Sequence, residues 1–422
     1  MNQERLNEIE KPLIKIVERD VVPALGCTEP ISLALAAATA AKYLGKTPER
    51  IEAKVSPNLM KNGLGVAVPG TSMVGLPIAA AIGALAGDPE GELEVLKHIT
   101  PEQVSQAKAM LDKKLVNVDM LFADNDRVKV AIQDQHTNII LIEKNGEVVF
   151  EKEHDECSDC DPYDIFKQVS SREIFEFSCE VELDKIRFIG QAAALNRALS
   201  NEGLRENYGL HIGRTLRKQV GSGLMSDDLL SKIMIETTAA SDARMGGATL
   251  PAMSNSGSGN QGIAATMPVV VVADYLNVSE EKRLRALFLS HLMAIYIHSK
   301  LPKLSALCAV TTASMGSCAG IAYLLTGKFE TVSMGICSMI GDISGIICDG
   351  ASNSCEMKVS TSLASGYKSV LMAMDETHVT GNEGIVEHDL DRTIDNLCSI
   401  ASKSMHHIDR QVIEIMVSKP CP

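Results

Sequence analysis

The chain has 422 residues, of which 45% are apolar and 22% charged, and it contains no Trp. A disordered chain would be poorer in apolar residues, so this composition indicates a globular protein with one large core or two domains. The formal net charge of −14 argues against nucleic-acid binding, which needs clustered Lys and Arg.

Residues 5–20 and 30–44 are predicted to be helices. The first carries apolar side chains at helical spacing, and the second has Pro30 in its first turn and Gly45 as its end signal. Cys27 lies between them, just before the second helix. A helix N-terminus lowers the pKa of a thiol, so we expect Cys27 to be activated.

The N-terminus "MNQERLNEIEKPL" is charged, and no apolar signal sequence is visible. Eleven cysteines in such a chain indicate a reducing compartment, which predicts a cytoplasmic protein with free thiols or metal ligands. The segments 64–87 and 304–327 are uncharged and long enough to span a bilayer. Because they are rich in Gly, Ala, Ser and Thr, we predict buried helices and turns, and no membrane contact.

The pattern changes after residue 87. A polar helix with Thr100 as its N-cap precedes four alternating, β-branched segments, and Asn145-Gly146 predicts a hairpin between the last two. Long Ala- and Leu-rich stretches then return. The predicted fold class is therefore α+β, with a mainly helical catalytic domain over 1–87 and 185–422 and an inserted α+β module over 88–184.

Four later segments are predicted to be helical: 188–200, 227–241, 280–298 and a run near 314–325. Between them lies "SGSGNQG", residues 256–262, which we read as a loop whose bare backbone can approach a ligand closely. It matches neither of the two common phosphate-binding glycine motifs.

The cysteines permit several interpretations. Cys157 and Cys160 form a C-x-x-C in an acidic loop with no second pair, so either a peripheral metal or redox site or a solvated loop fits. Cys348 and Cys355 are separated by turn-forming residues and, with a third thiolate such as Cys308, have a spacing compatible with an iron–sulfur cluster or with ordinary core packing. We predict structural roles for the others in apolar helices, which are Cys318, Cys337 and Cys398.

Several polar residues stand in Gly-rich apolar sequence. Arg244 is suited to the carboxylate of a small zwitterion, or to a structural ion pair with Asp242. His291 and His298 share a helical face and are predicted to be packed or exposed rather than to bind metal. The other polar residues of this kind are Ser56, Asn58, Lys61, Asn62, Asn260 and Gln261.

Taken together, these stretches resemble the L-cysteine desulfidase family, which is related to the α-chain domain of iron–sulfur L-serine dehydratases. The motifs that carry the resemblance are "PALGCTEP" (23–30), "SPNLMKNGLGVAVPGT" (56–71), "DARMGG" (242–247), "SNSGSGNQG" (254–262), "LSALCAV" (304–310) and "ICDGASNSC" (347–355). They are spread over nearly the whole chain outside the predicted insert.

The resemblance implies a [4Fe–4S] cluster held by three thiolates with one iron open to substrate; an aerobic preparation can lack it. Cys308, Cys348 and Cys355 match the family's late cysteines and are the expected ligands. Cys27 matches the early one, and it either replaces a ligand or faces the open iron. Cys421 near the C-terminus resembles the capping cysteine of the dehydratases, but no motif surrounds it, so a free terminal cysteine is the simpler interpretation.

The implied reaction is a β-elimination from L-cysteine that yields sulfide, ammonia and pyruvate without pyridoxal phosphate. We expect Lys61 to act as the base and Arg244 to bind the substrate carboxylate. The remaining substrate contacts are expected from Asn62, Ser256, Asn260 and Gln261, in a pocket too tight for side chains at Gly257 and Gly259. L-Serine dehydration and a non-catalytic amino-acid- or metal-binding protein are the alternatives, and a homo-oligomer is left open.

Overall fold

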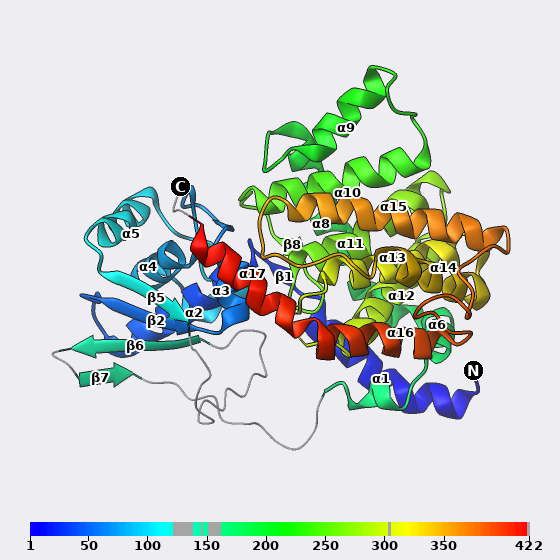
Figure 1. The fold of residues 1–422 in the computed structure, drawn as a ribbon, viewed down its shortest axis with the longest axis horizontal. Coiled ribbons are helices and arrows are strands. Elements are labelled where there is room, and N and C mark those ends of the chain that lie inside the picture. Colours follow the sequence, from blue (N-terminus) through cyan, green and yellow to red (C-terminus); the bar gives the residue numbers. More distant parts are fainter. Residues whose placement is uncertain (121–137, 145–146, 151–161, 303–304, 420–422) are drawn as a thin grey trace.

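The computed structural model describes residues 1–120, 138–144, 147–150, 162–302 and 305–419. It confirms a mainly helical α+β fold. A large bundle of helices occupies one side of the molecule, and a smaller part containing a sheet occupies the other (Figure 1).

The bundle is built around α13, which packs against α11, α12, α14 and α15 and buries a continuous apolar core. Its helices are α1 (Gln3–Asp20), α6 (Ser171–Glu180), α7 (Leu183–Ile186), α8 (Gly190–Arg205), α9 (Ile212–Gly221), α10 (Leu229–Met245), α11 (Gly259–Tyr275), α12 (Glu280–His298), α13 (Ala309–Thr326), α14 (Phe329–Ile343), α15 (Cys355–Met374), α16 (Leu390–Ser399) and α17 (His406–Ser418).

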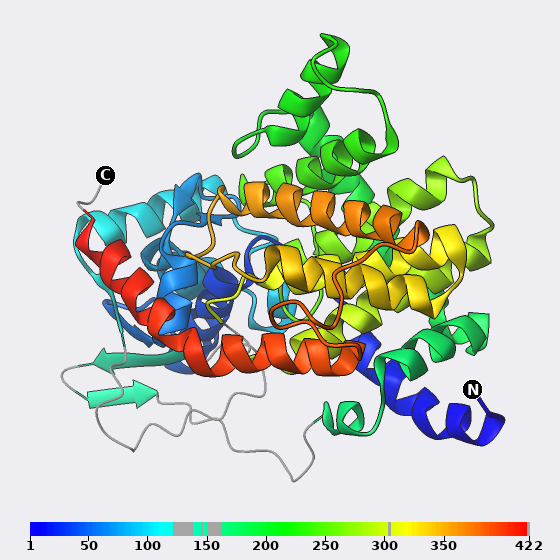
Figure 2. The same ribbon diagram turned by 45° about the vertical axis from the view of Figure 1, so that its right-hand side comes forward.

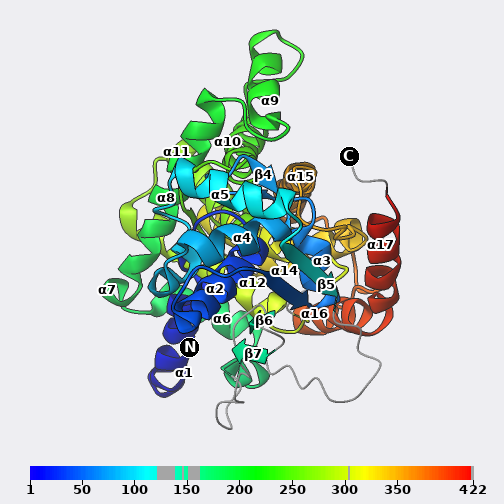
Figure 3. The ribbon, with the colours of Figure 1, turned by 90° about the vertical axis from the view of Figure 1, so that its left-hand side faces the viewer.

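The smaller part has a four-stranded sheet of order β5-β2-β6-β7, in which β2 pairs parallel with β5 and antiparallel with β6. Its strands are β2 (Ile51–Val55), β5 (Val116–Met120), β6 (Asn138–Lys144) and β7 (Glu147–Phe150), and its helices are α2 (Thr28–Leu44), α3 (Pro57–Gly63), α4 (Leu76–Ala86) and α5 (Pro101–Asp112). Helices α2 and α4 lie side by side (Figure 3).

Two short strand pairs complete the fold. One joins β1 (Pro23–Ala24) to β8 (Ala252–Met253) and so links the two parts of the chain. The other pairs β3 (Ala67–Val68) with β4 (Met73–Val74). Helix α17 extends from the bundle toward α3 and contacts it (Figures 1 and 2).

The predicted insert of residues 88–184 needs correction at both ends. Its strands β5 and β6 pair with β2, which precedes residue 88, and its helix α5 packs on α4. At the other end, α6 packs on α12 and buries Phe175 and Phe177 in the core of the bundle. The changes in composition near residues 88 and 184 predict domain boundaries there, but the sheet crosses the first position and the apolar core of the bundle crosses the second.

Most of the individual predicted elements are present. Helix α1 spans the first predicted helix, Gly45 ends α2 with φ 69°, and Thr100 caps α5 through a capping box. Strands β6 and β7 pair antiparallel as the hairpin requires, while its Asn145-Gly146 turn lies outside the described residues. The predicted strand at 127–134, the Cys157/Cys160 pair and Cys421 also lie outside them.

The two apolar segments of membrane-spanning length differ in structure. Residues 64–87 divide into β3, β4 and α4 rather than forming one helix. Among the described residues, α13 alone is a helix long and apolar enough to cross a membrane, and 78% of it is buried inside the structure. The helices α4 and α13 are mostly buried, as predicted, whereas Val74 in β4 is exposed.

The contact between α8 and α10 depends on Gly203. A Cβ at this position would lie 1.9 Å from the carbonyl oxygen of Ala239. Gly203→Ala should therefore reduce the free energy of unfolding by about 1–3 kcal/mol through overpacking, measured by chemical denaturation. Gly221→Ala is the matched control, because nothing lies within 4 Å of its added Cβ. Equal stability of the two variants would contradict this packing.

Candidate active site

A buried cavity of about 90 Å³ lies where the two parts of the chain meet. A single water needs roughly 10–15 Å³ on this measure, so the space suits a ligand of a few heavy atoms. Of the ten predicted site residues, nine line it: Cys27, Asn62, Arg244, Ser256, Asn260, Gln261, Cys308, Cys348 and Cys355. Their roles stay predictions, but the fold brings them together from six distant segments.

Four helices direct their N-terminal ends at this cavity. Cys27 and Cys308 are the N-cap residues of α2 and α13, Cys355 is the first residue of α15, and Gly259 is the first residue of α11. No side chain caps any of these four ends, whereas α1, α5 and α6 do have side-chain caps. The positive ends of the helix dipoles thus favour a negatively charged occupant.

The three cysteines predicted as ligands lie on one wall. All are free thiols; Cys308 is buried, and Cys348 and Cys355 are half-buried. Burial raises the pKa of Cys308 to about 12 and of Cys355 to about 11, and the charge of a neighbouring Cys348 thiolate raises both further. A thiolate set here therefore needs a cation. Among the described residues, no three His, Cys, Asp or Glu side chains stand close enough to share a single metal ion.

The expectation that Cys27 is activated by its position needs correction. The thiol is 2% exposed, with its sulfur 3.6 Å from the sulfur of Met245. Burial raises its pKa to about 12, and the nearby Arg244 charge only partly opposes this. Desolvation of the thiolate outweighs the helix terminus.

Arg244 is buried at 5% exposure, yet no described carboxylate lies within 4.0 Å of its guanidinium, and its Nε has no hydrogen-bond partner. The alternative of an ion pair with Asp242 is therefore not what the structure shows. Asp242 instead accepts a 2.8 Å hydrogen bond from the Gly213 N–H and contacts Glu356. A buried guanidinium without a counterion points to an anionic ligand.

Each of the three glycines in residues 256–262 is required for a different structural reason. Gly257 has φ 79°, a left-handed conformation that glycine adopts most easily. A Cβ on Gly259 would lie 2.1 Å from Arg244 Nε, and one on Gly262 would lie 1.9 Å from the Met253 carbonyl oxygen. Gly259 therefore admits the arginine rather than a ligand, which corrects the predicted reason for its small size.

The segment is also not a loop throughout. Helix α11 begins at Gly259, so Asn260 and Gln261 lie in its first turn. Asn260 accepts a 3.1 Å hydrogen bond from Ser241 Oγ, while Gln261 Oε1 is buried with no hydrogen-bond partner. Gln261 thus lines the cavity and carries a buried acceptor that has no partner among the described residues.

Lys61 is the predicted site residue that does not line the cavity. Its ammonium lies 2.5 Å from Asp409 Oδ1 on α17 and donates to the Cys348 carbonyl oxygen at 3.3 Å. An ammonium held by a carboxylate away from the cavity is poorly placed to accept a substrate proton. The structure instead gives Lys61 a supporting position.

Sequence reasoning missed Glu29, the one carboxylate among the residues that line the cavity. Its Oε1 accepts a 3.2 Å hydrogen bond from Asn62 Nδ2, and its Oε2 accepts another of 3.2 Å from Thr28. Asn62 also faces the Cys348 sulfur at 3.8 Å. The signal was present, since an acidic residue in the first turn of an apolar helix, two positions after Cys27, is unlike its surroundings.

His291 supports the glycine-rich segment from behind. Asn255 Nδ2 donates to the His291 carbonyl oxygen at 3.2 Å and faces Nδ1 at 3.0 Å, so Nδ1 is the acceptor. The proton is then on Nε2, which donates to Thr266 Oγ1 at 2.9 Å. Asn255 in turn accepts from Ser256 Oγ at 3.0 Å. The histidine is packed, as predicted, and neutral.

Comparison with known proteins places these features in a family. The family model described as serine dehydratase alpha chain matches residues 90–414. A UPF0597 protein of Actinobacillus pleuropneumoniae serotype 3 (strain JL03) is 68% identical over 426 residues, covering 98% of both chains. The UPF0597 protein YhaM of Escherichia coli O1:K1 / APEC is 58% identical over 432 residues, again 98% of both chains. Cys27, Glu29 and Asn62 precede the range matched by the family model.

The buried imidazole predicts a pH dependence of stability. Burial lowers the pKa of His291 to about 3 from an ordinary 6.5, so between these values the unfolded state binds the extra proton. The contribution of neutral His291 to the free energy of unfolding is fully present above pH 6.5. It falls as the pH decreases, by up to roughly 1.4 kcal/mol per pH unit. Denaturation at pH 7 and pH 5 should show a larger loss in wild type than in His291→Gln. Exposed His98→Gln, the control, should behave like wild type; equal losses in all three proteins would contradict the assignment.

Proposed function

Because the chain belongs to the serine dehydratase alpha chain family, we propose that it is a lyase that converts L-cysteine and water to pyruvate, ammonia and hydrogen sulfide. One observation carries the proposal: a buried arginine that pairs with no carboxylate of the described residues lines the same small cavity as three thiols. The family supports the lyase class, and the cavity supports the substrate and cofactor.

The two unpaired polar atoms suit the two charges of an α-amino acid. Arg244 Nε is a donor for the substrate carboxylate, and Gln261 Oε1 is an acceptor for its ammonium. Both atoms are buried, so a bound zwitterion relieves two desolvated groups at once. A molecule without both charges would leave one of them unpaired, which favours amino acids over simple carboxylic acids.

The donor set fits a [4Fe–4S] cluster. Cys308, Cys348 and Cys355 are soft ligands that line the same cavity, where Cys308 and Cys355 lie at the N-terminal ends of α13 and α15. When bound, such a cluster supplies a Lewis-acidic iron for the leaving sulfur. Cys27, the fourth thiol, stays a predicted alternative ligand.

Glu29 is the group we assign to accept the α-proton. It lies in the cavity wall, where Asn62 and Thr28 orient its carboxylate. Removal of the α-proton is coupled to cleavage of the C–S bond, and the sulfur departs as sulfide with the bonding electrons. The remaining aminoacrylate takes up water and yields pyruvate and ammonia. The step requires no residue with a Schiff base.

L-Serine is the second candidate substrate, since the matching family model is described by serine dehydration. Three serine hydroxyls line the cavity, at Ser256, Ser258 and Ser305, beside the apolar Met245 and Leu307. Anaerobic assays of sulfide released from L-cysteine and pyruvate formed from L-serine separate the two. A kcat/KM at least ten times higher for serine would replace the proposed substrate.

The cluster ligands can be tested without an activity assay. Protein purified or reconstituted anaerobically should contain iron and inorganic sulfide and absorb broadly near ~400 nm, and Cys348→Ala should lose most of both. Cys318→Ala, which changes a fully buried cysteine of α13 away from the cavity, is the control and should keep them. Equal iron content in the two variants would remove Cys348 from the ligand set.

The carboxylate contact can be tested through its packing. Gly259→Ala places a methyl group against Arg244, and Arg244→Lys removes the planar donor pair, so both should raise the KM for L-cysteine about 10–100-fold, the effect of losing roughly 1.5–3 kcal/mol of charged hydrogen bonding. Gly345→Ala, with no atom within 4 Å of its Cβ, is the control. An unchanged KM in Gly259→Ala would show that Arg244 does not bind substrate.

A further inference from the structure

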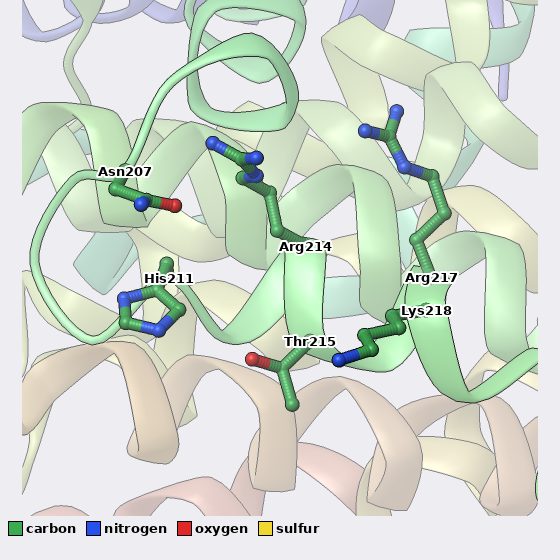
Figure 4. Close-up of a pocket in the computed structure, with 6 residues that line it drawn as sticks. All are labelled: Asn207, His211, Arg214, Thr215, Arg217 and Lys218. Atoms are coloured by element: carbon green, nitrogen blue, oxygen red, sulfur yellow. The ribbon is translucent and has the colours of Figure 1, made fainter.

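A second, larger hollow lies away from the active site, beside the projecting helix α9. Its volume is about 410 Å³, within the range of small-molecule sites. It is lined by Asn207, His211, Arg214, Thr215, Arg217 and Lys218 (Figure 4). Every one of these side chains is polar, and three are permanently cationic.

Within the described residues, these cations form no ion pair with a carboxylate. Among the described residues, no carboxylate oxygen lies within 4.0 Å of the side-chain nitrogens of His211, Arg214, Arg217 or Lys218. The segment 207–226 contains no Asp or Glu at all, in a chain whose net charge is −14. The hollow therefore carries a local excess of positive charge.

Two of the basic groups are anchored by hydrogen bonds. Arg214 and Lys218 are four residues apart in α9 and so lie on one face of the helix, and His211 is its N-cap residue. Arg214 donates to the Arg205 carbonyl oxygen at 3.2 Å and Arg217 to the Leu204 carbonyl oxygen at 2.7 Å, so the end of α8 anchors both guanidinium groups. Each guanidinium keeps further N–H donors. Figure 4 shows the Lys218 ammonium reaching back toward Thr215.

We propose that this hollow binds a small molecule through a phosphate or diphosphate group. Anchored guanidinium groups match the geometry of phosphate oxygens, and Lys218 and Thr215 add a point charge and a hydroxyl donor. The limited volume of this surface hollow and the negative net charge of the chain favour a small anion over a nucleic acid.

The hollow is connected to the active site by the backbone that precedes α9. The N–H of Leu210 donates to Glu356 Oε2 at 2.9 Å, and the N–H of Gly213 donates to Asp242 Oδ2 at 2.8 Å. Glu356 follows the predicted ligand Cys355, and Asp242 lies two residues before Arg244. A ligand that orders residues 207–213 would therefore act on the two helices, α10 and α15, that carry those side chains.

Titration calorimetry with pyrophosphate tests the site independently of activity and of the cluster. Wild type should bind one equivalent at 150 mM salt, and Arg214→Gln/Lys218→Gln should bind at least tenfold more weakly. The control Lys113→Gln/Arg410→Gln removes the same charge at exposed positions elsewhere and should bind like wild type. Equal weakening in both variants, or no binding by wild type at this salt concentration, would overturn the proposal.

A competition experiment and a single variant test the proposal further. Inorganic phosphate should compete with pyrophosphate, whereas equimolar chloride or acetate should not; competition by all of them equally would show a general surface charge and refute a phosphate site. The single variant Lys218→Gln leaves the hydrogen bonds of Arg214 and Arg217 to α8 intact, because the Lys218 ammonium itself forms no hydrogen bond or ion pair within the described structure. It should weaken binding several-fold with unchanged thermal stability.

Discussion

The convergence of four helix N-termini on one buried cavity is the constraint on which the site depends. Thiols are expensive to ionise where Cys27, Cys308 and Cys355 lie, because burial raises each pKa well above the ordinary value. The helix ends oppose this cost of ionisation, because their backbone N–H groups and dipoles favour negative charge. In such a site the thiols stay protonated unless a cation joins them, which is consistent with the cluster proposed above.

Close backbone packing makes that convergence possible. The helices that meet at the cavity approach through glycines whose added Cβ would overlap a neighbour, as at Gly259 against Arg244 and at Gly262 against the Met253 carbonyl. A larger residue at either position would separate α11 from its surroundings and move the first turn that carries Gln261. The polar cavity therefore requires the small residues that surround it.

Local signals in the sequence predicted what is locally determined. Helix α12 begins and ends where its apolar spacing does, and Thr100 caps α5 because its side chain bonds within the same turn. Long-range pairing was not legible: β2 joins β5 and β6 across more than 60 residues, so the boundary at residue 88 fell inside a sheet. The motif residues lie together around the cavity as expected, except that Lys61 lies outside it and Glu29, which was not predicted, lies in its wall. Nothing in "SPNLMKNG" shows that Lys61 pairs with a carboxylate 348 positions away.

That distant carboxylate explains how the site is held together. The cavity takes Cys27, Glu29 and Asn62 from the smaller part and the other cysteines from the bundle, so it exists only when the two are docked. Lys61 joins them, because its ammonium binds Asp409 of α17 and the Cys348 carbonyl at once. Gly350, with φ 99°, lets the segment between Cys348 and Cys355 approach the Lys61 carbonyl, where a Cβ would lie at 2.5 Å. The lysine therefore positions the segment that carries Cys348 and Cys355 against the smaller part of the chain.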